Sequence, residues 1–198
     1  MIGLVNKIGK EKIMVKSTFY VLFCFVLLFA GACKKRKARD KSAEIAQQNA
    51  LAENTLNDIQ YMTDEAAYGA QSFEAFYGEC VTLTYDTNDV SDTITIDYGT
   101  SGCLCQDGKR RKGKVIITFD GSYFDVGNLI TTTTDNYSVN GNLVEVNKTS
   151  KRTAQYETKV SIEASITLVD NGTIFWQSDK SRTQIAGDNT PFFLADNE

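Results

Sequence analysis

Apolar residues recur with helical spacing in residues 40–69, a segment rich in Ala, Glu, Gln and Leu that contains no Pro and no interior Gly. The stripe that repeats every seven residues consists of Ile45, Ala52, Ile59 and Ala66, with Leu56 and Met62 alongside. This spacing is typical of an amphipathic helix. Because Asn49 and Thr63 interrupt the second apolar row, we expect the stripe to dock on a sheet rather than to form a coiled coil. Gly69 is the expected end of the helix.

From Cys80 onward the apolar spacing changes to two, which is typical of strands with one buried face. The clearest alternation lies in residues 160–168, whose apolar members are Val160, Ile162, Ala164, Ile166 and Leu168. Residues 93–98, 115–119 and 129–139 are also rich in the β-branched and aromatic residues that strands favour.

Two Asn-Gly pairs separate strand-like segments. Asn140-Gly141 and Asn171-Gly172 both tolerate the positive φ angles of a two-residue hairpin turn. Strands joined by such tight turns are antiparallel neighbours, so we expect a β-meander with one apolar face and one wet face.

The predicted fold class is α+β, with an N-terminal amphipathic helix packed on an antiparallel β-meander sheet. The helix is expected over about residues 40–69 and the sheet over about residues 80–185. Pro191 is the single proline, and no Gly/Ser-rich linker is present, so residues 40–198 are expected to form one domain.

The N-terminus has the layout of an export signal. A positive region formed by four lysines precedes an apolar run at residues 19–30 and a small-residue end. The run is shorter than the ~20 residues of a membrane-spanning helix, and it fits a cleavable signal. Counted from Met14 the signal has ordinary length, so we expect Met14 to be the true start.

The stretch Phe29-Ala30-Gly31-Ala32-Cys33 resembles the bacterial lipobox, in which the cysteine thiol is diacylated and its freed α-amine is then acylated. This resemblance implies that residues 1–32 are a signal peptide and that Cys33 carries the lipid. Residues 33–39 would then be a basic tether at the membrane. Several acyl chains on one residue anchor a protein stably to a membrane. We therefore expect the protein in the cell envelope, most naturally at the outer membrane. The alternative is ordinary secretion with a free cysteine.

Charge excludes one class of partner. The signal segment holds four Lys and one Glu, so of the 21 basic and 25 acidic residues, 17 and 24 remain after cleavage. A nucleic-acid binder needs a basic excess over a whole face, and we expect none here. Basic residues do cluster at 34–41 and 109–114. The second cluster follows the turn signal Asp107-Gly108, so it is expected to be a solvated loop, with phosphate or headgroup binding as the alternative.

Three cysteines remain once Cys24 leaves with the signal and Cys33 takes the lipid. An oxidising envelope favours one disulfide among them, and we expect Cys80–Cys103, across a hairpin, with Cys105 free or paired between chains. The Cys103-Leu104-Cys105 spacing also suggests metal binding or redox chemistry as an alternative. Because the chain has no His and no second Cys pair nearby, we expect no metal site.

Catalytic constellations are missing from the sequence. Without His there is no Ser-His-Asp or Cys-His site, and no phosphate-binding glycine motif follows a strand. Five aspartates fall in predicted turns or strand ends, where Asp serves the backbone: Asp107, Asp120, Asp125, Asp135 and Asp170. The alternative is that some of these aspartates form a catalytic carboxylate pair or a Ca²⁺ cage.

Four aromatic residues are expected to pair with one another across strands of the sheet: Tyr98, Tyr123, Tyr137 and Trp176. The alternative is that they line a groove for a sugar or a lipid.

An ordered set of short motifs resembles a family of Gram-negative envelope lipoproteins. The motifs are Asp97-Tyr98-Gly99, Gly102-Cys103, Asp107-Gly108-Lys109, Arg111-Lys112-Gly113-Lys114-Val115, Gly121-Ser122-Tyr123 and Asp135-Asn136-Tyr137-Ser138-Val139-Asn140-Gly141. The resemblance implies an envelope location, and it assigns no activity and no site residue.

The chain departs from that family in two places. Val144-Glu145-Val146 stands where the family has V-E-G. Family members also continue beyond the point that corresponds to Glu198, so we expect a truncated C-terminus and an unpaired edge strand at residues 173–184. The alternative is that residues 188–198 fold back as a cap over the core.

These observations predict a non-catalytic, lipid-anchored envelope protein that is structural or binds a ligand or partner. No cofactor, catalytic residue or nucleic-acid partner is expected. The first alternative is a carrier of a lipid or apolar ligand in a curved sheet. The second is a hydrolase that uses acidic residues.

Overall fold

The computed structural model describes residues 41–69, 73, 77–78, 80–87, 91–170 and 172–185. The expected signal peptide, the start at Met14, the lipidation site Cys33 and the C-terminal cap therefore lie outside the described residues. The chain divides into two compact units, residues 1–49 and 50–198. In the first unit the described residues 41–49 are helical.

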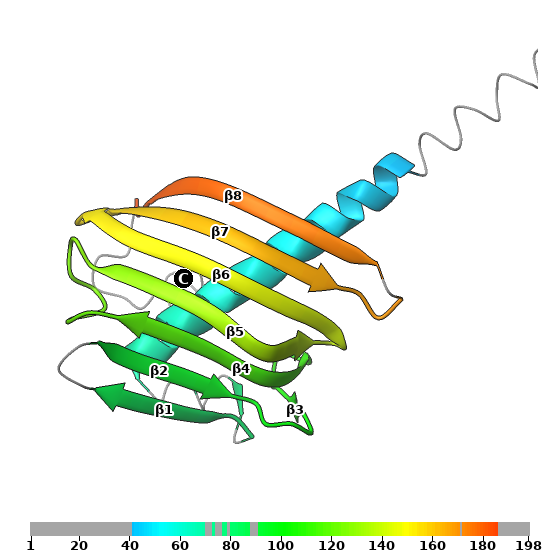
Figure 1. Cartoon of the computed structure of the whole chain (residues 1–198), viewed down its shortest axis with the longest axis horizontal. Helices are drawn as coiled ribbons and strands as arrows, with labels where there is room; N and C mark the ends of the chain where they lie inside the picture. The colour runs from blue at the N-terminus through cyan, green and yellow to red at the C-terminus, as the bar shows by residue number, and fades with distance from the viewer. Residues whose placement is uncertain are drawn as a thin grey trace, which may run out of the picture. The chain divides into compact units, whose positions relative to one another are not determined.

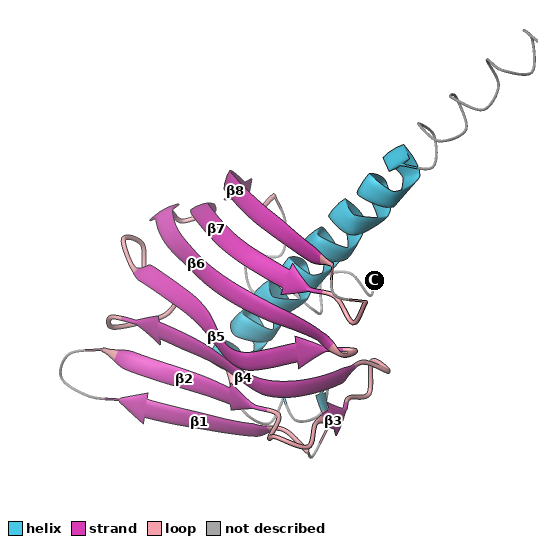
Figure 2. Ribbon diagram, turned by 45° about the vertical axis from the view of Figure 1, so that its right-hand side comes forward, coloured by secondary structure: helices cyan, strands magenta, loops and turns pink. Residues whose placement is uncertain are grey.

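One helix covers the described residues 41–68, and it ends one residue before the expected end at Gly69. From residue 50 onward it crosses one face of the sheet, as Figures 1 and 2 show. Four residues of the predicted stripe are fully buried there: Ala52, Ile59, Met62 and Ala66. Ile45 is exposed, contrary to the expected stripe.

The buried side of the helix also holds polar residues, so it is less cleanly amphipathic than the spacing suggested. Thr63, expected to interrupt the stripe, is fully buried, and its hydroxyl donates to the Ile59 carbonyl oxygen at 2.8 Å. Thr55 donates in the same way to Leu51. This bond to the preceding turn lets a threonine lie against a core without an unpaired hydroxyl. Glu65 is buried as well, at 4% exposure.

In the described part of the chain, eight strands form one antiparallel sheet. They are β1 (Thr82–Thr87), β2 (Asp92–Asp97), β3 (Cys103–Leu104), β4 (Arg110–Phe119), β5 (Leu129–Val139), β6 (Asn142–Ala154), β7 (Glu157–Thr167) and β8 (Thr173–Thr183). The strand order is β1-β2-β4-β5-β6-β7-β8, and the short β3 pairs only with β4. With the helix, this sheet gives the α+β class that the sequence predicted.

The turn between β5 and β6 is the one that the Asn-Gly signal predicted. Asn140 and Gly141 have φ angles of 51° and 85°, and they connect Val139 directly to Asn142. These two positive angles are what the hairpin turn requires. Of the second predicted turn, Asn171 lies outside the described residues. The last strand, β8, lies at one edge of the sheet (Figure 1), with Phe175 82% exposed.

Two of the sequence motifs, at residues 111–115 and 135–141, meet at an irregularity between β4 and β5. The pairing shifts between Lys112 and Lys114, and Gly113 there has a φ of 80°. A Cβ at Gly113 would collide with the backbone of Asn136, which itself has a φ of 48°. Only glycine fits such a close backbone approach, so the pairing of β4 with β5 in this chain requires Gly at position 113.

Candidate functional site

The helix-facing side of strands β5–β8 changes from apolar to polar along the strands. Residues paired across neighbouring strands point to the same face of a sheet. The apolar rows are Val144–Ile166–Ile174 and Val146–Ala164–Trp176. The rows that follow are Thr132–Lys148–Ile162–Ser178, Ile130–Ser150–Val160–Lys180 and Arg152–Thr158–Arg182. Four cationic side chains therefore belong to this side of the sheet: Lys148 and Arg152 on β6, and Lys180 and Arg182 on β8.

Lys148 lies deepest of these cations. Its side chain is 2% exposed, and its Nζ has no hydrogen-bond partner among the described residues. Two hydroxyl oxygens close to it in the sheet, Thr132 Oγ1 and Ser150 Oγ, are also buried without a partner. Buried polar groups are normally hydrogen-bonded, so this cluster of unpaired donors and acceptors is unusual.

Two adjoining cavities lie between the helix and these strands. One has a volume of about 160 Å³ and is lined by Leu56, Asn57, Gln60, Lys148, Lys180 and Arg182, among others. The other has a volume of about 150 Å³ and is lined by Asp64, Tyr68, Tyr123, Phe124, Arg152 and again Gln60 and Arg182. Because they share Gln60 and Arg182, we treat the two as one site and call it the cationic cleft.

Electrostatics in the cleft favour a negative occupant. Burial away from water lowers the pKa of Lys148 to about 8, from an ordinary value of 10.5. Asp64 opposes this shift, whereas Arg182 and Lys180 add to it. Asp64 is already engaged, since its carboxylate accepts hydrogen bonds from Gln60 and from the Tyr123 hydroxyl at 2.8 Å. An anion beside Lys148 would restore the charged state that burial disfavours.

A second polar cluster shows that the basic segment 109–114 is not a solvated loop as expected. Arg111 is fully buried on β4, and its guanidinium donates to both oxygens of Asp107 and to Asp58 Oδ2 at 2.7 Å. Lys109 also contacts Asp58, at 2.9 Å. Asp58 and Asp107 neutralise the charges of Lys109 and Arg111, which the sequence predicted to be exposed to solvent.

Tyrosine rings complete the setting of Arg111. Its guanidinium lies 5.2 Å from the ring centroid of Tyr77 and 6.0 Å from that of Tyr98. Because every charge in this cluster is paired with an opposite charge, the cluster links the helix to the sheet and is not an open binding site.

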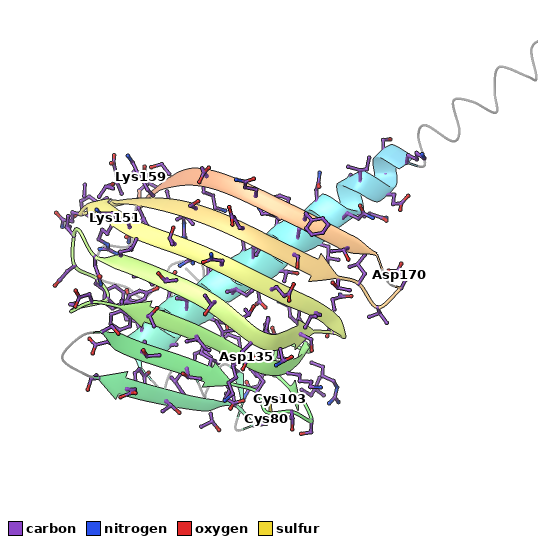
Figure 3. The ribbon with its side chains drawn as sticks, viewed as in Figure 1. Cys80, Cys103, Asp135, Lys151, Lys159 and Asp170 are labelled. Atoms are coloured by element: carbon purple, nitrogen blue, oxygen red, sulfur yellow. A yellow bond between two sulfur atoms is a disulfide. The ribbon has the colours of Figure 1, made fainter. Side chains whose placement is uncertain are left out.

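The predicted aspartates do not gather in one place. Only Asp107 joins a second carboxylate, that of Asp58, and both are bound to Arg111. Asp135 and Asp170 lie well apart (Figure 3), and each accepts a hydrogen bond within its own turn or strand. In the described residues, no group of three or more acidic or cysteine side chains has an arrangement that would hold a metal ion.

The aromatic residues singled out in the sequence take two different positions. Tyr98 and Tyr137 are core residues whose ring centroids lie 6.1 Å apart, and the Tyr98 hydroxyl donates to Met62 Sδ at 3.0 Å. Tyr123 instead lines the cationic cleft, beside Phe124 with a centroid distance of 4.9 Å. Trp176 lies in an apolar row of the sheet.

The cysteines of the sheet are close together. Cys80 and Cys103, which lie side by side in Figure 3, form a disulfide with a Cα–Cα distance of 5.6 Å. This is the pair that the sequence favoured. Cys105 is a free, buried thiol.

Comparison with known proteins adds no assignment: no protein-family model, no curated protein and no solved structure matches the chain. The resemblance to envelope lipoproteins therefore stays a prediction. Within the described part of the chain, no helix has the length and apolar character that crossing a membrane requires.

Proposed function

We propose that this chain is a non-catalytic, lipid-anchored protein of the cell envelope that binds a small anionic ligand in the cationic cleft. The lipobox resemblance at Cys33 supports the anchor, and the buried Nζ of Lys148, which has no hydrogen-bond partner among the described residues, supports the ligand. The near-sequential strand order supports a β-meander, covered by the helix, as the scaffold of the site.

Lys148 carries this proposal. A buried ammonium without a counter-charge costs several kcal/mol, by the order of magnitude that applies to ions in protein interiors. An apolar residue at this position would fill the space without that cost, as Ile162 does on the neighbouring strand. Lysine therefore fits the site best when an occupant supplies negative charge and hydrogen-bond acceptors.

The size of the cleft indicates what kind of anion fits. Each cavity is similar to the ~150 Å³ cavity that admits benzene in an engineered protein, so each holds a group of a few heavy atoms. A carboxylate or phosphate group next to Lys148 and Arg182 matches this volume and charge. The shared wall at Gln60 lets a larger ligand extend toward the rings of Tyr68 and Tyr123.

The two alternatives have less support. A lipid carrier needs an extended apolar cavity, whereas three cations line the cavity around Lys148. An acidic-residue hydrolase needs two carboxylates that face the same cleft. In the cationic cleft, Asp64 supplies a single carboxylate.

Calorimetric titration of the full mature chain with inorganic phosphate and with acetate tests the proposal. We expect at least one of these oxyanions to bind the wild type, and Lys148→Met to weaken that binding at least tenfold. Lys151→Met is the matched control, because Lys151 is exposed on the other face of the same strand, where it pairs with Lys159 (Figure 3). Equal binding by wild type and Lys148→Met would refute the site.

A further inference from the structure

The free thiol of Cys105 lies against the disulfide. Its Sγ is 4.0 Å from Cys103 Sγ, close to van der Waals contact. Cys103 begins the short strand β3 and Cys105 follows that strand directly, and the Cys105 thiol also lies 3.9 Å from the Cys103 carbonyl oxygen. Both are buried, with 2% and 3% exposure, whereas Cys80 is exposed. A nucleophile, a disulfide and a solvated leaving group are therefore arranged in that order.

We propose that Cys80, Cys103 and Cys105 form an internal thiol–disulfide exchange site. The Cys105 thiol loses its proton to water, and the resulting thiolate attacks Cys103 Sγ. The Cys103–Cys105 bond forms as the Cys80–Cys103 bond breaks, and Cys80 leaves as a thiolate that takes up a proton. One disulfide is exchanged for another, so the step needs no oxidant and no reductant.

The surroundings of Cys105 keep this exchange slow at rest. Burial raises the pKa of the Cys105 thiol, and Asp107 and Asp58 raise it further, while the Arg111 guanidinium opposes the shift. Only the thiolate attacks a disulfide. The site therefore holds Cys80–Cys103 as its resting pair, and higher pH speeds the exchange.

The exchange changes the chemical group at the exposed position 80 from a disulfide sulfur to a free thiol. In the resting state the disulfide ties residue 80, which precedes β1, to β3. After exchange this tie is released, and the exposed Cys80 carries a free thiol. The product is a surface position that can form a mixed disulfide with another thiol or disulfide compound.

Alkylation and peptide mapping of the oxidised full chain test the mechanism. The chain is incubated with N-ethylmaleimide at pH 9 without reductant. We expect label on Cys80, together with a peptide that contains the Cys103–Cys105 bond. In Cys105→Ser the labelling of Cys80 should fall at least tenfold. Equal labelling of Cys80 in both proteins, or label on Cys105 alone in the wild type, would overturn the proposal.

A second variant tests the geometry without kinetics. Cys80→Ser leaves Cys103 and Cys105 as the only pair in the sheet, and we expect them to form a disulfide in the exported protein. Two freely alkylated thiols at these positions, in a variant whose circular dichroism matches the wild type, would also overturn it.

Discussion

Arg111 Nη2 lies 2.7 Å from Asp58 Oδ2 and so joins β4 to the helix across 53 positions of the chain. The same guanidinium also donates to both oxygens of Asp107, at 2.9 and 2.6 Å. Because Arg111 has no exposed surface, its charge depends on these two carboxylates for compensation.

We expect Arg111→Met to lower the free energy of unfolding by about 3–5 kcal/mol, the usual cost of removing one partner from a buried ion pair. Arg111→Lys should recover only part of this loss, because an ammonium cannot reproduce the forked geometry of a guanidinium. Urea denaturation measures both variants. Arg110→Met, at the exposed neighbouring position, is the control and should change stability by less than about 1 kcal/mol.

Glu65 predicts a separate dependence of stability on pH. Burial, with a contribution from Asp64, raises the pKa of Glu65 from 4.5 to about 7. The folded chain therefore holds this proton more tightly than the unfolded chain does. The contribution of protonated Glu65 to the free energy of unfolding is fully present below about pH 4.5. This contribution is lost as the pH rises through 7.

Glu65→Gln removes this titration. The variant should match the wild type at pH 4.5 and exceed its free energy of unfolding at pH 8 by up to ~3 kcal/mol, at 1.36 kcal/mol for each pKa unit. Denaturation at the two pH values measures the difference. Glu53→Gln, on the exposed side of the same helix, should show no such crossover. A parallel pH response of wild type and Glu65→Gln would contradict the assignment to Glu65.

Local signals in the sequence identified the elements of the fold. The apolar spacing located the helix, Gly69 located its C-terminal end to within one residue, and Asn140-Gly141 located a hairpin turn. These features depend on neighbouring residues along the chain. The short β3 was not expected, because two residues show no alternation and its pairing with β4 depends on the tertiary fold.

The polar sites were harder to predict. The contact between Asp58 and Arg111 is not visible in the sequence, because charges alone do not reveal which residues a fold brings together. Lys148 left a usable signal, since it is in phase with the buried Val144 and Val146 on β6. Strict alternation in that strand would have placed a lysine on the core face.

The membrane anchor is tested through Cys33. Cys33→Ala removes the thiol that the lipobox resemblance assigns to acylation, so the variant should fail to incorporate labelled palmitate and should leave the membrane fraction. Cys105→Ser, which keeps the signal intact, is the control and should stay with the membranes. Sedimentation of unlabelled Cys33→Ala with membranes would contradict the anchor.

The last prediction concerns the cost of keeping a lysine in the cationic cleft. The pKa of Lys148 is lowered to about 8 in the folded chain, so the unfolded chain binds this proton more tightly. The wild type is therefore penalised below pH 8 and gains stability as pH rises from 8 toward 10.5. The penalty amounts to at most ~3 kcal/mol at 1.36 kcal/mol for each pKa unit.

Lys148→Met should therefore be more stable than the wild type at pH 7 and lose this advantage toward pH 10.5, while anion binding disappears. Because other groups also titrate in that range, the quantity to measure is the difference in free energy of unfolding between the two proteins at each pH. Lys151→Met should differ little from the wild type in both stability and binding. A gain in stability with loss of binding indicates a residue kept for its ligand and not for the fold. If Lys148→Met is instead less stable than the wild type at pH 7, then Lys148 serves the fold, and the cationic cleft loses its main support as a binding site.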